Sequence, residues 1–169
     1  MRTALLLAFL ACMALTFVAH AVLPETVAIH FGAGGAPDGW APKMTNTLIF
    51  LGLYVLLFVM YWRSPRVLAV VPSRWVSLPH KEYWLEPEHE AEAARRLGRL
   101  MAVHGVLTFA FFAVVSLLTI RANLETPVRL AEGPFLVALV LYLAATAGWC
   151  VWMFRSFRPP ATSDRSPAV

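Results

Sequence analysis

The sequence predicts an all-α membrane protein with four transmembrane helices, and three observations carry that prediction. Apolar residues make up 59% of the 169 residues and charged residues only 14%, whereas soluble domains have about 45–50% and about 25%. Four segments of 18 to 21 residues contain no Asp, Glu, Lys or Arg. Such lengths cross a bilayer as helices, because lipid offers the backbone no hydrogen-bond partners. The segments are residues 4–22, 45–62, 100–120 and 134–154.

The distribution of basic residues predicts the orientation. Eleven of the fourteen Lys and Arg residues flank one side of the four segments, and three flank the other. The positive-inside rule then places both termini and the 63–99 loop in the cytoplasm, and the 23–44 and 121–133 loops outside. We expect a multi-pass protein of the bacterial inner membrane. Its predicted parts are a first hairpin (1–62), a cytoplasmic loop with a charged helix (63–99), a second hairpin (100–154) and a disordered tail (155–169).

The first apolar segment admits two interpretations. A basic start and the pattern Ala19-His20-Ala21 are typical of a cleavable signal peptide. The apolar run is long for a signal peptide, so we expect a retained transmembrane helix. The two cysteines, Cys12 and Cys150, lie inside apolar runs and predict buried thiols, with neither a disulfide framework nor a zinc site.

The long cytoplasmic loop contains a predicted helix that begins at Pro87 and runs on into the third span. Proline suits a first helical position. Acidic residues gather at the start of this helix and basic residues further along it, which complements the helix dipole. Glu92 can pair with Arg95 or Arg96 at spacings of three and four residues.

The stretch IHFGAGGAPDGW (29–40) stands apart from the apolar segments. A dinucleotide-binding fingerprint needs a third glycine where this chain has Pro37, and it must follow a strand, so we reject that interpretation. APDGW predicts a type I turn with Pro37, Asp38 and Gly39 at its second, third and fourth positions.

His30 and Asp38 can approach each other across this turn. They could form a structural hydrogen bond, share a metal with His20, or belong to a recognition surface. We expect the structural bond, and no metal. On that view, His30→Ala or Asp38→Ala lowers the folded yield more than Lys43→Ala does.

Two loop segments resemble a bacterial membrane domain of unknown function that is found in SdpI-type immunity proteins. Segment 23–43 carries a Leu-Pro start, a His followed by an aromatic residue, a G-x-x-D pattern and a closing Lys. Segment 78–93 is similar to a stand-alone branch of that family, with His89 where an Arg is expected. The matching residues are Leu23, Pro24, His30, Phe31, Gly35, Asp38 and Lys43 in the first segment, and Tyr83, Trp84, Leu85, Pro87 and Glu88 in the second.

The resemblance implies a protein related to those that protect a producing cell from a secreted peptide toxin and tether a transcriptional repressor at the membrane. SdpI-type proteins are larger and have additional membrane helices. This chain resembles the short form and lacks those extra helices, and the family pattern assigns no catalytic role to the matching residues.

Other polar or small residues lie within or beside the predicted spans. His104 lies one turn into the third span, and an intramembrane ionisable residue is a functional hypothesis by default. Ala144 and Gly148 form a small-xxx-small pair, for which we expect packing inside the protein. Basic residues beside the second span can contact anionic headgroups, although topology alone explains them. These are Arg63, Arg66 and Arg74.

The sequence contains no nucleophile–base pair, zinc-protease motif or phosphate loop. We therefore expect a non-enzymatic protein without cofactor, whose partners are lipid and a protein or peptide, and not nucleic acid. The first hypothesis is an immunity-like or peptide-binding module that acts through its outer loop. The alternatives are a scaffold subunit of a membrane complex and, more weakly, a membrane enzyme or small transporter that uses His30, Asp38 and His104.

Overall fold

The computed structural model describes residues 1–160 and confirms the four predicted apolar helices. They are α1 (Arg2–Val22), α2 (Lys43–Arg63), α5 (Glu90–Leu124) and α6 (Glu132–Ser156). All four are long and apolar enough to cross a membrane, which indicates a multi-pass membrane protein.

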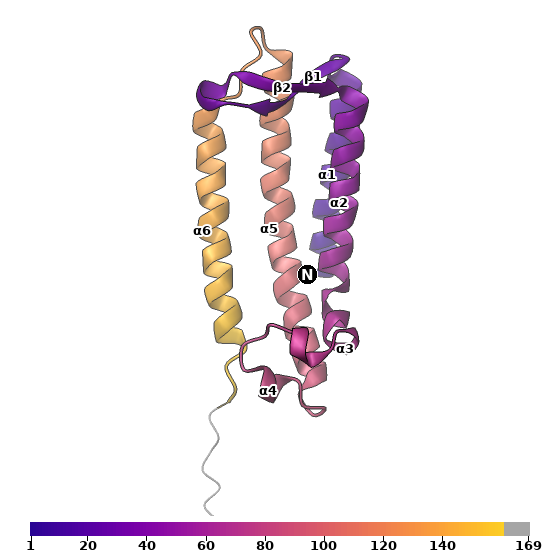
Figure 1. Ribbon diagram of the computed structural model, residues 1–169, viewed down its shortest axis with the longest axis vertical. Coiled ribbons are helices and arrows are strands. Elements are labelled where there is room, and N and C mark those ends of the chain that lie inside the picture. The colour runs from indigo at the N-terminus through magenta and orange to yellow at the C-terminus, as the bar shows by residue number, and fades with distance from the viewer. Residues whose placement is uncertain (161–169) are drawn as a thin grey trace, which may run out of the picture.

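Helix α5 is the central element of the fold and packs against α1, α2 and α6 (Figure 1). The close approach of α1 and α2 to α5 depends on Gly105, where an added Cβ would lie 2.6 Å from Leu5 Cδ1 and 2.9 Å from Tyr61 Cγ. Around this point lies an interior of aromatic and small residues. Its buried members are Leu5, Cys12, Tyr54, Ala102 and Phe109.

The predicted buried thiol is confirmed for Cys12 but not for Cys150. Cys12 is buried and its Sγ donates to the carbonyl oxygen of Phe109 at 3.2 Å, while Cys150 is half-buried and also free. Neither thiol forms a disulfide.

The connection from α1 to α2 is a β-hairpin, which the all-α prediction missed. Strands β1 (Thr26–Phe31) and β2 (Pro37–Pro42) pair antiparallel around the 3-10 turn η1 (Ala33–Gly35). The predicted type I turn at APDGW is wrong, because Pro37, Asp38 and Gly39 all lie in β2. The chain instead reverses through Gly34 and Gly35, whose φ angles of +78° and +72° suit glycine.

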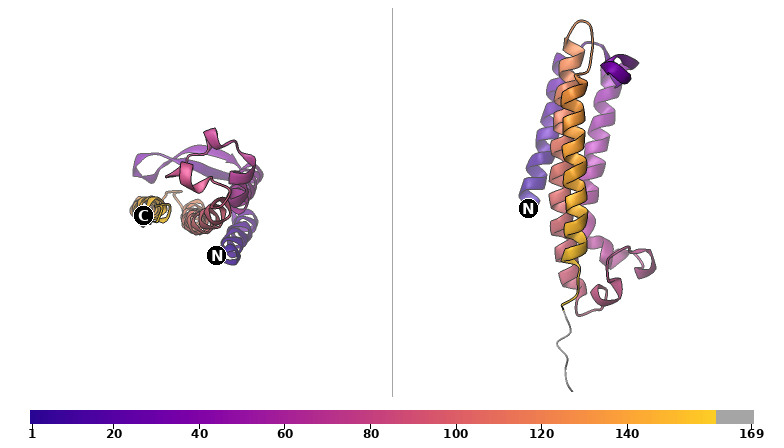
Figure 2. Two further views of the ribbon diagram at one scale, coloured as in Figure 1. Left: turned by 90° about the horizontal axis from the view of Figure 1, so that it is seen from below. Right: turned by 90° about the vertical axis from the view of Figure 1, so that its left-hand side faces the viewer.

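The segment between α2 and α5 is a chain of short turns. It comprises η2 (Ser64–Arg66), α3 (Val67–Val70), η3 (Ser73–Trp75) and α4 (Lys81–Trp84). The hairpin and this segment lie at opposite ends of the helices but project from the same side of them (Figure 2).

The charged helix begins later than predicted. It starts at Glu90, with Pro87 in the preceding turn, and it continues without a break into the third span, as expected. Because its first turn contains Glu90 and Glu92, the acidic start suits the helix dipole. Of the two predicted partners of Glu92, Arg96 makes the ion pair.

The predicted disordered tail needs correction. Residues 155–157 do not begin a disordered tail, because α6 extends to Ser156 and Phe157 is fully buried; residues 161–169 lie outside the described residues.

The small residues Ala144 and Gly148 do not pack inside the protein as predicted. Both are exposed on α6, and an added Cβ at Gly148 would meet nothing within 4 Å.

Candidate functional site

The hairpin brings His30 and Asp38 together, as one of the predicted alternatives required. Their Nδ1 and Oδ1 atoms are 2.5 Å apart, and their side chains are 73% and 53% exposed. Strand β1 pairs His30 with Gly39 and Phe31 with Pro37, so Asp38 is an extra residue in the register. Such a bulge re-aims side chains, and here it turns the carboxylate toward the imidazole.

The other motif residues of the hairpin support its shape. Lys43 closes the base, because its Nζ lies 2.9 Å from Glu25 Oε1 and its backbone N–H donates to the carbonyl oxygen of Glu25. Gly35 is buried at the tip, where an added Cβ would lie 2.2 Å from the carbonyl oxygen of Leu130. Phe31 is half-buried.

The sequence analysis missed the residue that fixes the hairpin to the helices. Asn123, buried near the end of α5, accepts from the Ala28 N–H at 2.7 Å and donates to the Ala28 carbonyl at 3.1 Å. At the tip, Arg129 donates to the carbonyl oxygen of Gly34 at 2.7 Å, and the Leu130 N–H donates to that of Gly35. The signal in the sequence was a single asparagine, Asn123, close to the end of an apolar span.

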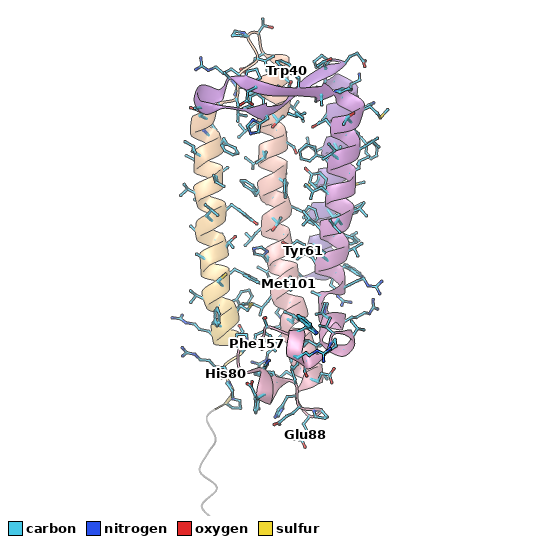
Figure 3. All side chains as sticks on the ribbon, viewed as in Figure 1. Trp40, Tyr61, His80, Glu88, Met101 and Phe157 are labelled. Carbon is cyan, nitrogen blue, oxygen red and sulfur yellow. The ribbon has the colours of Figure 1, made fainter. Side chains whose placement is uncertain are left out.

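These anchors leave a set of side chains on the hairpin that the helices do not cover. Trp40 is 51% exposed and lies where the hairpin crosses α5 (Figure 3). Ile29 has no partner in the strand register, and its side chain is also exposed. We use the term outer face of the hairpin for these two exposed residues together with His30 and Asp38.

The metal alternative finds no support in the part of the chain that the structure describes. No group of three or more His, Cys, Asp or Glu residues lies close enough there to hold a metal ion. His20 does not share a hydrogen bond with His30 or Asp38. Its Nδ1 bonds instead to Thr47 Oγ1 at 2.9 Å.

The motif between α2 and α5 forms a small core that attaches the end of α6. Trp84 is 1% exposed, its Nε1 donates to the carbonyl oxygen of Phe157 at 2.7 Å, and the two rings meet edge to face. The Arg96 guanidinium lies 4.5 Å from the Trp84 ring and also donates to the Ser156 carbonyl. Tyr83 stacks on His89 and Leu85 packs at the rim, whereas Pro87 and Glu88 are exposed.

His104 belongs to a polar network that links α2, α5 and α6. Its Nδ1 lies 3.0 Å from Tyr61 Oη, and Thr108 Oγ1 lies 3.0 Å from that oxygen and 3.2 Å from Tyr142 Oη. Thr108 also bonds to the His104 carbonyl, so its single hydroxyl proton is donated there. Both tyrosine hydroxyls then donate to Thr108, and His104 Nδ1–H donates to Tyr61. The other ring nitrogen, Nε2, is the acceptor and faces Thr146 Oγ1 at 3.5 Å.

Comparison with known proteins gives one match. A family model described as "Domain of unknown function (DUF1648)" matches residues 7–55, which is less than a third of the chain and covers most of α1, the hairpin and the first half of α2. No curated protein and no solved structure matches the chain.

Proposed function

We propose that this chain is a non-enzymatic recognition module of the bacterial inner membrane, which binds an envelope-active peptide or a membrane protein through the outer face of its hairpin. The proposal rests on one observation. Hydrogen bonds and ion pairs hold the hairpin in place at its base, middle and tip, and the residues of the outer face take no part in these contacts. Exposed ion pairs contribute only about 0–1 kcal/mol. The His30–Asp38 pair is therefore better suited to a partner than to stability.

The chemistry of this face suits a peptide. It combines an indole, an aliphatic side chain and an adjacent donor–acceptor pair, and aromatic anchors beside polar groups are typical of recognition surfaces. The sheet has two strands, so the edge of β2 away from β1 is without a partner strand among the described residues. An extended peptide can add to such an edge.

The matched segment 7–55 includes the hairpin and one of the two segments on which the resemblance to SdpI-type proteins rests; the other is segment 78–93. An immunity-like role enters the proposal through that resemblance alone. The charge distribution supports an orientation in which the hairpin is outside the cell and both termini are in the cytoplasm.

Site-specific photocrosslinking in native membranes tests the proposal. An aromatic photoreactive residue is placed at Trp40 and, as a matched control, at Trp75, a tryptophan that is 71% exposed at the other end of the molecule. We expect one peptide or protein to be captured at Trp40 and not at Trp75, and the double change His30→Ala/Asp38→Ala to abolish that capture at unchanged protein level. Capture of lipid alone at Trp40, or of the same peptide at both positions, would contradict recognition by the hairpin.

A survival assay tests the immunity-like part. Cells that lack the protein should be more sensitive to at least one member of a panel of envelope-active peptides. The native chain should restore survival, and the His30→Ala/Asp38→Ala chain should not. Equal survival of all strains would exclude protection against the panel.

A scaffold role is the second candidate, and the shared direction of the two connections favours it. Because the hairpin and segment 64–89 project from one side (Figure 2), a single neighbouring membrane protein could contact both. Capture of the same membrane protein at Trp40 and at Trp75 would support this candidate over peptide recognition.

A further inference from the structure

A basic hollow lies where α1 begins beside α5. Helix α1 starts at Arg2 and Leu5 already contacts Gly105, so α5 extends several turns beyond the start of α1. Beside the step lies an open hollow of about 560 Å³ on the surface of the protein. Its walls carry Arg2, Arg95 and Arg99. Its floor is formed by small residues of α5, among them Ala94, Gly98 and Ala102.

The charges of this hollow are not balanced within the described residues. Arg95 and Arg99 are four residues apart on one helix, a spacing at which like charges repel. No carboxylate lies within ion-pair distance of either residue, or of Arg2, in the described part of the chain. Glu92 lines an adjacent hollow on the other side of Arg95 and Arg99, but it pairs with Arg96. An anion from outside the chain would offset this repulsion.

The Arg2 side chain is held in a position that suits such an anion. Its guanidinium lies 5.2 Å from the centre of the Trp62 ring, at the end of α2. Stacking over an aromatic face leaves the N–H groups at the edge of the guanidinium free to donate. Guanidinium groups bind phosphate oxygens in a bidentate manner, which gives them an advantage over lysine at such sites.

The position of the hollow along the membrane helices suits a lipid headgroup. It lies at the end of the uncharged part of α5, which begins at Leu100, and next to Trp62. Tryptophan is typical of the membrane–water interface, and basic pockets between membrane helices bind anionic headgroups. A hollow of this size lies within the range of about 300–1,000 Å³ that is usual for small-ligand sites.

We propose that Arg2, Arg95 and Arg99 form a binding site for the phosphate of an anionic phospholipid. The phosphate lies in the hollow between the three guanidinium groups, over the small residues of α5. The acyl chains extend along the apolar faces of α1 and α5. The site is independent of the hairpin and of the function proposed for it.

Native mass spectrometry of the detergent-purified full chain tests this site. Phosphatidylglycerol is titrated against phosphatidylcholine, with the native chain, Arg95→Gln/Arg99→Gln and the matched control Arg63→Gln/Arg66→Gln. The control removes the same charge from exposed arginines at the same end of the molecule. We expect at least about tenfold weaker phosphatidylglycerol binding for Arg95→Gln/Arg99→Gln and less than about twofold for the control. An unchanged elution profile in size-exclusion chromatography checks folding, and Arg95→Lys/Arg99→Lys should recover part of the binding.

Three outcomes would overturn the proposal. Equal losses in the two double variants would show that net charge alone attracts the lipid. Displacement of phosphatidylglycerol by an equal concentration of inorganic phosphate would show a site for a free anion. An intact mass that lacks α1 would remove Arg2 from the mature protein and, with it, the site.

Discussion

Tyr61 of α2 and His104 of α5 are hydrogen-bonded through the phenol oxygen and Nδ1 at 3.0 Å, and Thr108 joins this pair to Tyr142 of α6. Thr108 is thus the point at which three membrane helices share polar contacts. Since α6 has no buried residue of its own, we infer that this network contributes to its attachment.

Loss of the Thr108 hydroxyl should loosen α6. Thr108→Val keeps the shape and removes the bonds, and we expect a loss of about 1–2 kcal/mol, because such bonds between membrane helices average about 0.6 kcal/mol each. Thr108→Ser keeps the hydroxyl and should retain most of the stability. The thermal unfolding midpoint in detergent measures both, and equal midpoints for Val and Ser would contradict the shared role of the hydroxyl.

Asn123 should control the mobility of the hairpin. Asn123→Ala leaves the Ala28 N–H and carbonyl without their partners, at a cost of about 1–3 kcal/mol for buried polar groups. We expect faster hydrogen exchange at the Ala28 amide. The control is Asn46→Ala, which changes a half-buried asparagine of α2 that makes no side-chain hydrogen bond among the described residues. It should leave that exchange rate unchanged. If both variants exchange equally, Asn123 does not anchor the strand.

Gly35 should not tolerate a side chain. In Gly35→Ala, the Cβ would overlap the carbonyl oxygen of Leu130, and the φ of +72° disfavours alanine. We expect a lower thermal midpoint and loss of hydrogen-exchange protection at Leu130. Gly133→Ala, where the added Cβ meets nothing within 4 Å, should be neutral or stabilising by up to about 1 kcal/mol. A Gly35→Ala chain as stable as Gly133→Ala would show that the tip contact is dispensable.

Trp84 should matter far more than Trp75, although both lie in the segment between α2 and α5. Trp84→Ala empties the small core around Phe157 and should cost about 3–5 kcal/mol. Trp75 is exposed, and Trp75→Ala should change stability by less than about 0.5 kcal/mol. Urea unfolding in detergent followed by circular dichroism measures the difference. Similar losses would argue against a packed inner segment.

We expect the stability ranking of the hairpin motif to be the reverse of the one expected from the sequence. Lys43→Ala removes a half-buried ammonium that bridges Glu25 Oε1 and, at 3.5 Å, the Leu23 carbonyl. His30→Ala and Asp38→Ala break only an exposed pair, which is worth about 0–1 kcal/mol. We expect folded yield in detergent to fall most for Lys43→Ala. A larger loss for either of the other variants would restore the structural role of the His30–Asp38 pair.

Some features of the fold were readable from local patterns. The four long helices follow from uncharged runs, and the passage of the charged helix into the third span follows from its continuous helical composition. The hairpin was missed, even though TVAIHF is rich in β-branched and aromatic residues. Its turn was misplaced because Pro37-Asp38-Gly39 is a strong turn signal, and the neighbouring Gly34-Gly35 pair took that role instead.

The sequence by itself determined that this chain crosses a membrane with four helices, because the transfer of apolar side chains into lipid depends on local composition and length. It also indicated that His30 can reach Asp38, because a short reversal between them suffices. Only the tertiary structure decided that Asn123 holds Ala28, that Thr108 joins Tyr61 to Tyr142, and that Arg2 lines the same hollow as Arg95 and Arg99. These contacts link residues far apart in the chain, and their partners are set by how the helices pack, which no local pattern encodes.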